Sequence, residues 1–266
     1  MKLHRTAPVI TGVAVALTGL LSGGILTASA HDGPKASSSH VATHGDSIPN
    51  VTVVENQIKA YYGDTVNAED GLHYPSSTGS YANEMAHITA AAKDYLKGQA
   101  SRKHSGKPAL VFDVDDTTLN TYNYEIFSTF AYNPTSNADF VNNAKFPAVF
   151  GMPALVNWAN DNGYTVFFLT GRPVTQRDGT AANLAKVGYA ASADVDHLYL
   201  KDKVNPPAYL PCGATCTTTE YKSGTRKHIE SLGYDIVANF GDQWSDLNGG
   251  YADKTFKVPN PMYYLP

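Results

Sequence analysis

The sequence contains no run of lysine or arginine residues, and its charge is only mildly unbalanced. It has 20 Lys and Arg residues against 24 Asp and Glu residues, a formal net charge of −4 at neutral pH. A mildly acidic chain without concentrated positive charge is a poor ligand for polyanions. Binding to a nucleic acid polymer is therefore not expected.

Cysteine is scarce, since Cys212 and Cys216 in the segment PCGATC are the only two in the chain. Two alternatives remain for this pair. One is half of a metal site, but no nearby His or Cys pair completes it. The other is a disulfide across a Gly-containing turn, which suits a secreted protein. We favour the disulfide, and its short loop predicts a local clamp with little effect on global stability.

No long apolar run is free of glycine. Residues 9–26 are apolar, but glycine interrupts them four times, so they would span a membrane poorly. They follow a basic start and precede the sequence Ala-Ser-Ala at 28–30. This pattern favours a signal peptide over residues 1–30, with cleavage near Ala30, against a single membrane anchor. We therefore predict a secreted, extracellular protein without membrane contact after cleavage.

Internal repeats are also absent, and the chain that follows the signal peptide is long enough for one sizeable core. Residues 31–49 are rich in Ser, His, Gly and Ala and contain almost nothing that could enter a core. We expect a flexible leader there, whose histidines are solvated. Residues 50–266 are then the folded domain.

Short apolar runs alternate with helical patterns along this domain. Several of these runs are apolar without alternation, which is typical of strands buried on both faces of a parallel sheet. Alternating strands and helices imply right-handed crossovers and a three-layer α/β/α Rossmann-like domain. Strands are expected at 109–112, 164–170, 196–200, 235–240 and 254–258, the last at an edge, and helices at 51–62, 81–99, 152–162, 174–187 and 219–232.

The first of these strands ends in a cluster of acids. Residues 108–120 read PALVFDVDDTTLN, so Asp113, Asp115 and Asp116 fall within four positions directly after the apolar run. Like charges this close are costly without a positive partner, and a divalent metal is the simplest one. In open α/β sheets, ligands gather beyond the carboxyl ends of the strands. The alternative is an acidic loop that caps the next helix through Asp116 or Thr117.

Polar and cationic groups follow the later elements. Thr170, Gly171 and Arg172 come at the end of the second strand, where a hydroxyl, a permissive glycine and a guanidinium can cradle an oxyanion. Lys222 is placed in the first turn of its expected helix, against the helix dipole, which suggests that it faces an anion instead of solvent. Taken alone, each of these signals is weak.

A second acid cluster, Asp242 and Asp246 in GDQWSD, follows the fourth strand and could meet the first above the sheet. Together these groups suit phosphoryl transfer. One carboxylate can attack phosphorus and form an acyl phosphate. A second acid two residues on can protonate the departing alkoxide and then deprotonate water. Mg²⁺ fits an all-oxygen site, and cationic and hydroxyl donors stabilise the charge on the phosphoryl oxygens.

The motifs that carry these groups resemble those of a known family. VFDVDDTTL, FFLTGR, the Lys222 segment and GDQWSD resemble, in order, the four motifs of the haloacid dehalogenase (HAD) superfamily of phosphohydrolases. Their details are similar to the secreted acid phosphatases of subfamily IIIB, the group with the class B enzymes and plant vegetative storage proteins. The resemblance implies an HAD-like fold with a small cap, Mg²⁺, and a small phosphomonoester substrate. Class B relatives also suggest that a homo-oligomer can form.

The resemblance implies roles by position. Asp113 matches the nucleophile and Asp115 the general acid/base, whose backbone carbonyl also reaches the metal. The metal-binding positions are Asp113, Asp115 and Asp242. The phosphate-binding positions are Thr170, Gly171 and Lys222, and the supporting ones are Asp246 and Arg172. For Arg172 two roles stay open, orienting an acid or facing the substrate.

The residue type at the position of Asp115, two residues after the nucleophile, differs between the branches of the superfamily. Its dehalogenases lack an acid there and its transport ATPases carry Thr, so Asp115 implies phosphomonoester hydrolysis, with an acidic pH optimum expected from the resemblance. The alternatives are a phosphotransferase on the same site or a catalytically weak storage protein, although the chain keeps Asp113. We expect residues 121–150 to form the small cap and residues 201–218 an irregular insertion that carries the cysteine pair.

Overall fold

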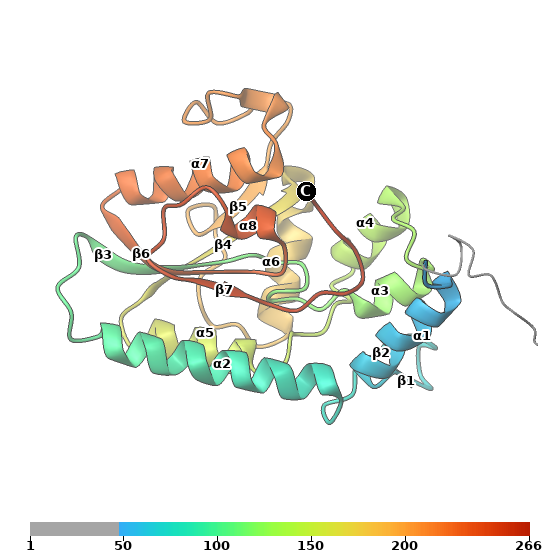
Figure 1. The fold of residues 1–266 in the computed structure, drawn as a ribbon. Helices are drawn as coiled ribbons and strands as arrows, with labels where there is room; N and C mark the ends of the chain where they lie inside the picture. The colour runs from blue at the N-terminus through green and yellow to red at the C-terminus, as the bar shows by residue number, and fades with distance from the viewer. Residues whose placement is uncertain (1–47) are drawn as a thin grey trace, which may run out of the picture. The chain divides into compact units, whose positions relative to one another are not determined.

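The computed structural model describes residues 48–266 (Figure 1), so the predicted signal peptide and nearly all of the leader lie outside the described residues. A parallel sheet lies at the centre of residues 49–266. Its strands are β3 (Lys107–Phe112), β4 (Thr165–Pro173), β5 (Leu198–Lys201), β6 (Tyr234–Gly241) and β7 (Thr255–Lys257). The order β5-β4-β3-β6-β7 makes β3, the strand before Asp113, the central one.

Helices cover both faces of this sheet. In Figure 1, α2 (Ser80–Gln99) and α5 (Met152–Asp161) lie on one face, and α7 (Thr218–Ser231) lies on the other. The side chains of β3 alternate between two buried clusters, with Leu110 and Phe112 in one and Ala109 and Val111 in the other. Burial on both faces explains the continuous apolar run, and the three-layer α/β/α prediction is confirmed.

The remaining elements are shorter or lie at the margins of the sheet. The helix expected at 51–62 is α1 (Val51–Tyr62), and the one expected at 174–187 starts as a 3₁₀ turn, η2 (Val174–Gln176), before α6 (Arg177–Lys186). The sequence did not predict the hairpin of β1 (Thr65–Val66) and β2 (His73–Tyr74). Further short elements are α3 (Tyr122–Phe127), α4 (Pro134–Asn142), η3 (Gly213–Thr215) and α8 (Trp244–Leu247).

The segment 121–150 folds into α3 and α4, which Figure 1 shows on the side of the sheet toward which β3 runs. Its aromatic residues range from buried to exposed. Tyr122 and Tyr124 are fully buried, whereas Phe127 and Tyr132 are 57% and 70% exposed. Part of this segment is therefore packed core, and part presents aromatic rings to solvent.

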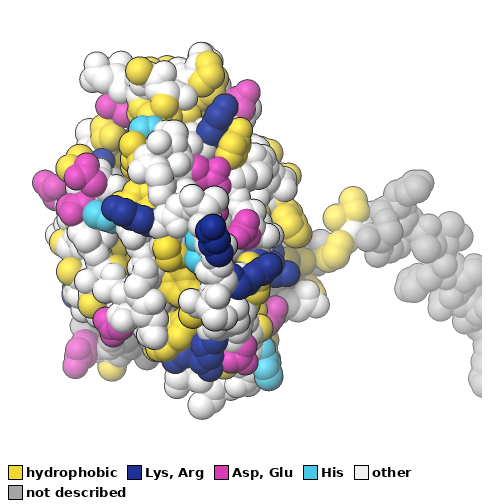
Figure 2. All heavy atoms as spheres, turned by 90° about the vertical axis from the view of Figure 1, so that its left-hand side faces the viewer, with side chains coloured by type: hydrophobic (Ala, Val, Ile, Leu, Met, Phe, Trp, Pro, Cys, Tyr) yellow, Lys and Arg dark blue, Asp and Glu magenta, His cyan; other side chains and the backbone are white. Residues whose placement is uncertain are grey.

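The distribution of charged side chains on the surface is consistent with the nearly balanced charge of the sequence. On the face drawn in Figure 2, Lys and Arg side chains lie interspersed with Asp and Glu side chains and form no continuous basic stripe. Within residues 48–266, no helix combines the length and the apolar character that crossing a membrane requires.

Cys212 and Cys216 form a disulfide, which confirms the predicted pairing. The bridge encloses η3 within the irregular segment 201–218, and Lys201 Nζ ties this segment to β5 by donating to the Cys216 carbonyl over 2.8 Å.

We expect the double variant Cys212→Ser/Cys216→Ser to lose at most about 2 kcal/mol of unfolding free energy, because the closed loop is very short. Urea unfolding of the oxidised parent and of the variant would measure this difference. A loss of several kcal/mol would show that the disulfide supports more than the 201–218 segment.

Candidate active site

Three carboxylates converge at the carboxyl edge of the sheet. Asp113 directly follows β3 and Asp242 directly follows β6, and these strands are neighbours paired at Phe112 and Phe240. Asp246 joins them from α8. All three side chains are buried, and each contributes an oxygen to a group whose atoms lie within 4.8 Å of one another. The two acid clusters predicted from the sequence therefore meet.

Lys222 lies among these acids. Its Nζ is bonded to Asp113 Oδ1, lies 3.1 Å from Asp246 Oδ1 and donates to the Leu169 carbonyl over 2.5 Å. Burial opposes its charge, but the carboxylates of Asp113 and Asp246 raise its pKa above the ordinary value, so Lys222 is charged. The expected position in the first helical turn was wrong. The helix begins one residue earlier than expected, at Thr218, which puts Lys222 in the second turn.

One ammonium cannot balance three carboxylates. Burial and the charge of Asp246 raise the pKa of Asp113 well above its usual range, although Lys222 opposes this rise. Burial and the negative charges of Asp246 and Asp116 also raise the pKa of Asp242 well above its usual range. The remaining repulsion and the all-oxygen donor set fit a hard divalent cation held by these three side chains.

The carboxylate of Asp242 is fixed by its neighbours. Its Oδ2 accepts hydrogen bonds from Gln243 Nε2 and Asn260 Nδ2, both over 2.7 Å. Donors of this kind orient metal-binding carboxylates in proteins. Asp246 is fixed as well, because its Oδ2 accepts a hydrogen bond from the backbone N–H of Gln243 over 2.9 Å.

The side chain of Asp115 does not join this cluster. It binds Arg172 instead, whose Nη2 donates a hydrogen bond to Oδ1 over 2.6 Å and whose Nε donates one to Oδ2 over 3.1 Å. The guanidinium is itself held by Thr180, whose Oγ1 accepts from Nη1 over 2.9 Å. Arg172 is 6% exposed. Of the two roles considered for Arg172, this contact matches the orientation of an acid.

Thr170 and Gly171 lie at the end of β4, next to the central strand. Thr170 is fully buried, and its Oγ1 accepts from the Arg172 amide over 3.1 Å, which shapes the turn. A Cβ at Gly171 would meet no heavy atom within 4 Å. The backbone here is open to the approach of a phosphate group.

Asp116 does not cap a helix, so the alternative reading of the acidic loop does not hold. Its carboxylate accepts from Thr121 N over 2.9 Å and from Tyr263 Oη over 2.8 Å. The next helix, α3, begins only at Tyr122 with Thr121 at its N-cap, so neither Asp116 nor Thr117 caps it. Burial raises the pKa of Asp116 to about 7, against the effect of the bonds from Thr121. Asp116 therefore ties the acidic loop to the C-terminal segment.

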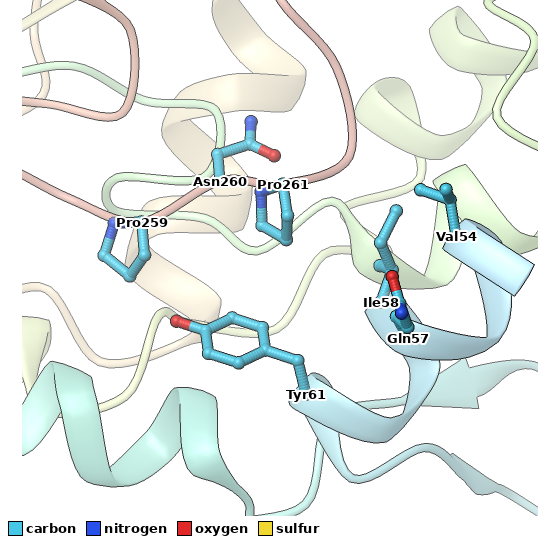
Figure 3. Close-up of a pocket in the computed structure, with 7 residues that line it drawn as sticks. All are labelled: Val54, Gln57, Ile58, Tyr61, Pro259, Asn260 and Pro261. Atoms are coloured by element: carbon cyan, nitrogen blue, oxygen red, sulfur yellow. The ribbon is translucent and has the colours of Figure 1, made fainter. Parts of the chain in front are cut away.

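Sequence reasoning missed the contribution of that C-terminal segment. Asn260 and Tyr263 reach Asp242 and Asp116, but neither belongs to a recognisable motif. Figure 3 shows Asn260 beside a groove between α1 and Pro259–Pro261. The residues that line this groove carry no charged side chain, so we assign no chemistry to it.

Comparison with known proteins decides the family. The model of HAD superfamily, subfamily IIIB (acid phosphatase), matches residues 25–266. The chain belongs to this family. The HAD-type acid phosphatases are phosphoric monoester hydrolases, and HAD proteins generally use a divalent metal. The resemblance found in the four motifs is confirmed.

Individual relatives support the assignment to this acid phosphatase family. Acid phosphatase 1 of Solanum lycopersicum is 33% identical over 189 residues, which cover 70% of this chain and 69% of that protein. Vegetative storage protein 1 of Arabidopsis thaliana is 28% identical and covers 88% of this chain and 80% of that protein. The class C acid phosphatase from Bacillus anthracis with tungstate bound shares the fold, with a TM-score of 0.62 at 21% identity over 81% of this chain and 87% of that one.

Proposed function

We propose that this acid phosphatase is a secreted, Mg²⁺-dependent enzyme that hydrolyses small phosphomonoesters through an aspartyl phosphate on Asp113. One observation carries the proposal. The Asp113 carboxylate lies at the end of the central strand, bonded to Lys222, and a second acid, Asp115, held by Arg172, follows two residues later. The loop after β3 thus supplies both a nucleophile and a proton donor, and the neighbouring strand β4 holds the proton donor through Arg172.

In the proposed reaction, an Asp113 oxygen attacks phosphorus and the ester P–O bond breaks. Asp115 gives a proton to the departing alkoxide. Water then attacks the aspartyl phosphate and Asp115 takes a proton from it, so that phosphate leaves and Asp113 is restored. Lys222, Thr170 and the Gly171 backbone would bind the phosphoryl oxygens.

Asp113, Asp242 and Asp246 are the side chains that would hold the metal, with the backbone carbonyl of Asp115 added by resemblance to the family. Asp246, expected only to support the site, also offers a ligand oxygen to this group. When bound, Mg²⁺ would offset the repulsion between the buried carboxylates and the phosphate oxygens.

We also propose the domain organisation and location expected from the sequence. Residues 1–30 are the signal peptide, residues 31–49 the leader, and residues 121–150 a cap over the site. The disulfide supports an oxidising, extracellular compartment. A Glycine max relative named stem 28 kDa glycoprotein, 32% identical over 66% of this chain and 74% of its own length, supports the same location.

The proposed metal dependence predicts that hydrolysis of p-nitrophenyl phosphate by the protein from His31 onward needs Mg²⁺. Excess chelator should lower the rate by about two orders of magnitude or more, and added Mg²⁺ should restore it. Release of phosphate would be measured from acidic to neutral pH. A folded, metal-loaded protein that binds a phosphate analogue but releases no phosphate would contradict the proposal and favour the storage alternative.

A further inference from the structure

Arg226 is a fully buried cation one helical turn beyond Lys222 on α7. Its side chain is 0% exposed, and Lys222, four residues earlier, is 2% exposed, so both lie on the buried face of the helix. Burial lowers the pKa of Arg226 to about 10, against the negative charges of Asp246 and Glu230, so the guanidinium is charged at neutral pH. A buried charge is costly unless its surroundings compensate it, so the groups that Arg226 contacts indicate what it does.

The guanidinium of Arg226 binds the backbone that follows the acid Asp246. Its Nη1 donates to the Asp246 carbonyl over 2.5 Å, its Nη2 to the Asn248 carbonyl over 2.6 Å, and its Nε to the Gly250 carbonyl over 2.9 Å. Within residues 48–266, the guanidinium makes no hydrogen bond or ion pair with a carboxylate. Three donors of one rigid, planar group therefore fix the chain from residue 246 to residue 250 against α7.

The backbone of Asp246 is held from the sheet as well as from α7. Its carbonyl also accepts a hydrogen bond from Asn239 Nδ2 on β6 over 2.9 Å. A Cβ at Gly241 would lie 2.4 Å from the Asp246 Cβ, so the Asp246 side chain packs directly on the Gly241 backbone. The place of the Asp246 carboxylate in the acid cluster therefore depends on how its own backbone is held.

We propose that Arg226 is a positioning residue for the metal site, which acts through the Asp246 backbone to keep the Asp246 carboxylate beside Asp113 and Asp242. The inference rests on the proposed function, because it assumes that these three carboxylates hold the metal. Replacing a residue that orients a metal ligand typically lowers metal affinity by about 10- to 100-fold. Helix α7 then places both Lys222, the cation bonded to Asp113, and the metal ligand Asp246.

The experiment measures Mg²⁺ binding to the metal-free protein from His31 onward by isothermal titration calorimetry. The Mg²⁺ concentration that gives half-maximal hydrolysis of p-nitrophenyl phosphate is the second readout. Arg226→Lys keeps the charge, but one ammonium cannot bind all three carbonyls as the planar group does, so Mg²⁺ affinity should fall about tenfold or more. Arg102→Lys makes the same substitution at an exposed residue and should match the parent.

A role of Arg226 in stability alone predicts a different result. Arg226→Lys would then lower the melting temperature and leave the Mg²⁺ affinity unchanged, which would overturn the inference. If Arg226→Lys does not fold, Asn239→Leu, which removes the other bond to the Asp246 carbonyl, must show the fall in affinity instead. A parent that binds Mg²⁺ no more tightly than the tested variant loses only this inference. A parent that binds no Mg²⁺ removes the proposed metal dependence and the inference together.

Discussion

Replacing Asp113 with Asn is expected to abolish turnover and to leave the fold intact. The amide cannot attack phosphorus, so kcat should fall by at least about 10⁴-fold. The fold should survive because Lys222 keeps Asp246 at 3.1 Å and the Leu169 carbonyl at 2.5 Å as partners. Burial and Asp246 already disfavour the charge on Asp113, so removal of that charge relieves repulsion in the metal-free protein.

The measurement is steady-state hydrolysis of p-nitrophenyl phosphate with saturating Mg²⁺, together with the melting temperature. Asp161→Asn makes the same substitution at an exposed residue of α5 and should match the parent in both. Intact mass must confirm that the introduced amide has not deamidated back to the carboxylate. A variant of verified mass that retains substantial activity would remove Asp113 as the nucleophile.

The layered fold was predictable because the strands of the sheet are short and apolar. Val111 and Phe112 face opposite buried clusters, so nothing in β3 needs to be polar until the strand ends. The pattern therefore indicates both the strand and its burial on two faces. The short hairpin of β1 and β2 was missed because two residues per strand, exposed or half-buried, leave no periodicity to read.

The meeting of Asp113 with Asp242 was predictable for the same topological reason. Parallel neighbours end at one edge of a sheet, so residues that directly follow them converge whatever their separation in sequence. The direction in which a side chain points could not be predicted in this way. The spacing of Asp113 and Asp115 did not show that one enters the acid cluster while the other turns to Arg172.

The support from the C-terminal segment could not be read from the sequence. Asn260 reaches Asp242 across 18 residues, and Tyr263 reaches Asp116 across 147 residues. Contacts of this kind depend on how the chain returns after the last strand, and no local pattern of residues encodes that path.

Replacing Asp115 with Asn should separate the two halves of the reaction. The p-nitrophenolate group leaves without a proton, so the first step with p-nitrophenyl phosphate should stay fast. Water still needs a base, so hydrolysis of the phospho-enzyme should slow by about 10²- to 10⁴-fold. Arg172 can still donate to the Asn oxygen, which keeps the local geometry. We expect a burst of p-nitrophenolate followed by slow turnover.

Propyl phosphate supplies the contrast, because its alkoxide is a poor leaving group without a proton donor. With this ester the variant should show no burst and no phospho-enzyme, since the first step is now slow as well. Intact mass after mixing should detect one added phosphoryl group with p-nitrophenyl phosphate only, and Asp161→Asn should behave as the parent with both esters. If the Asp115 variant shows neither adduct nor slowing, Asp115 does not transfer the proton, and the pair with Arg172 only stabilises the turn at the end of β4.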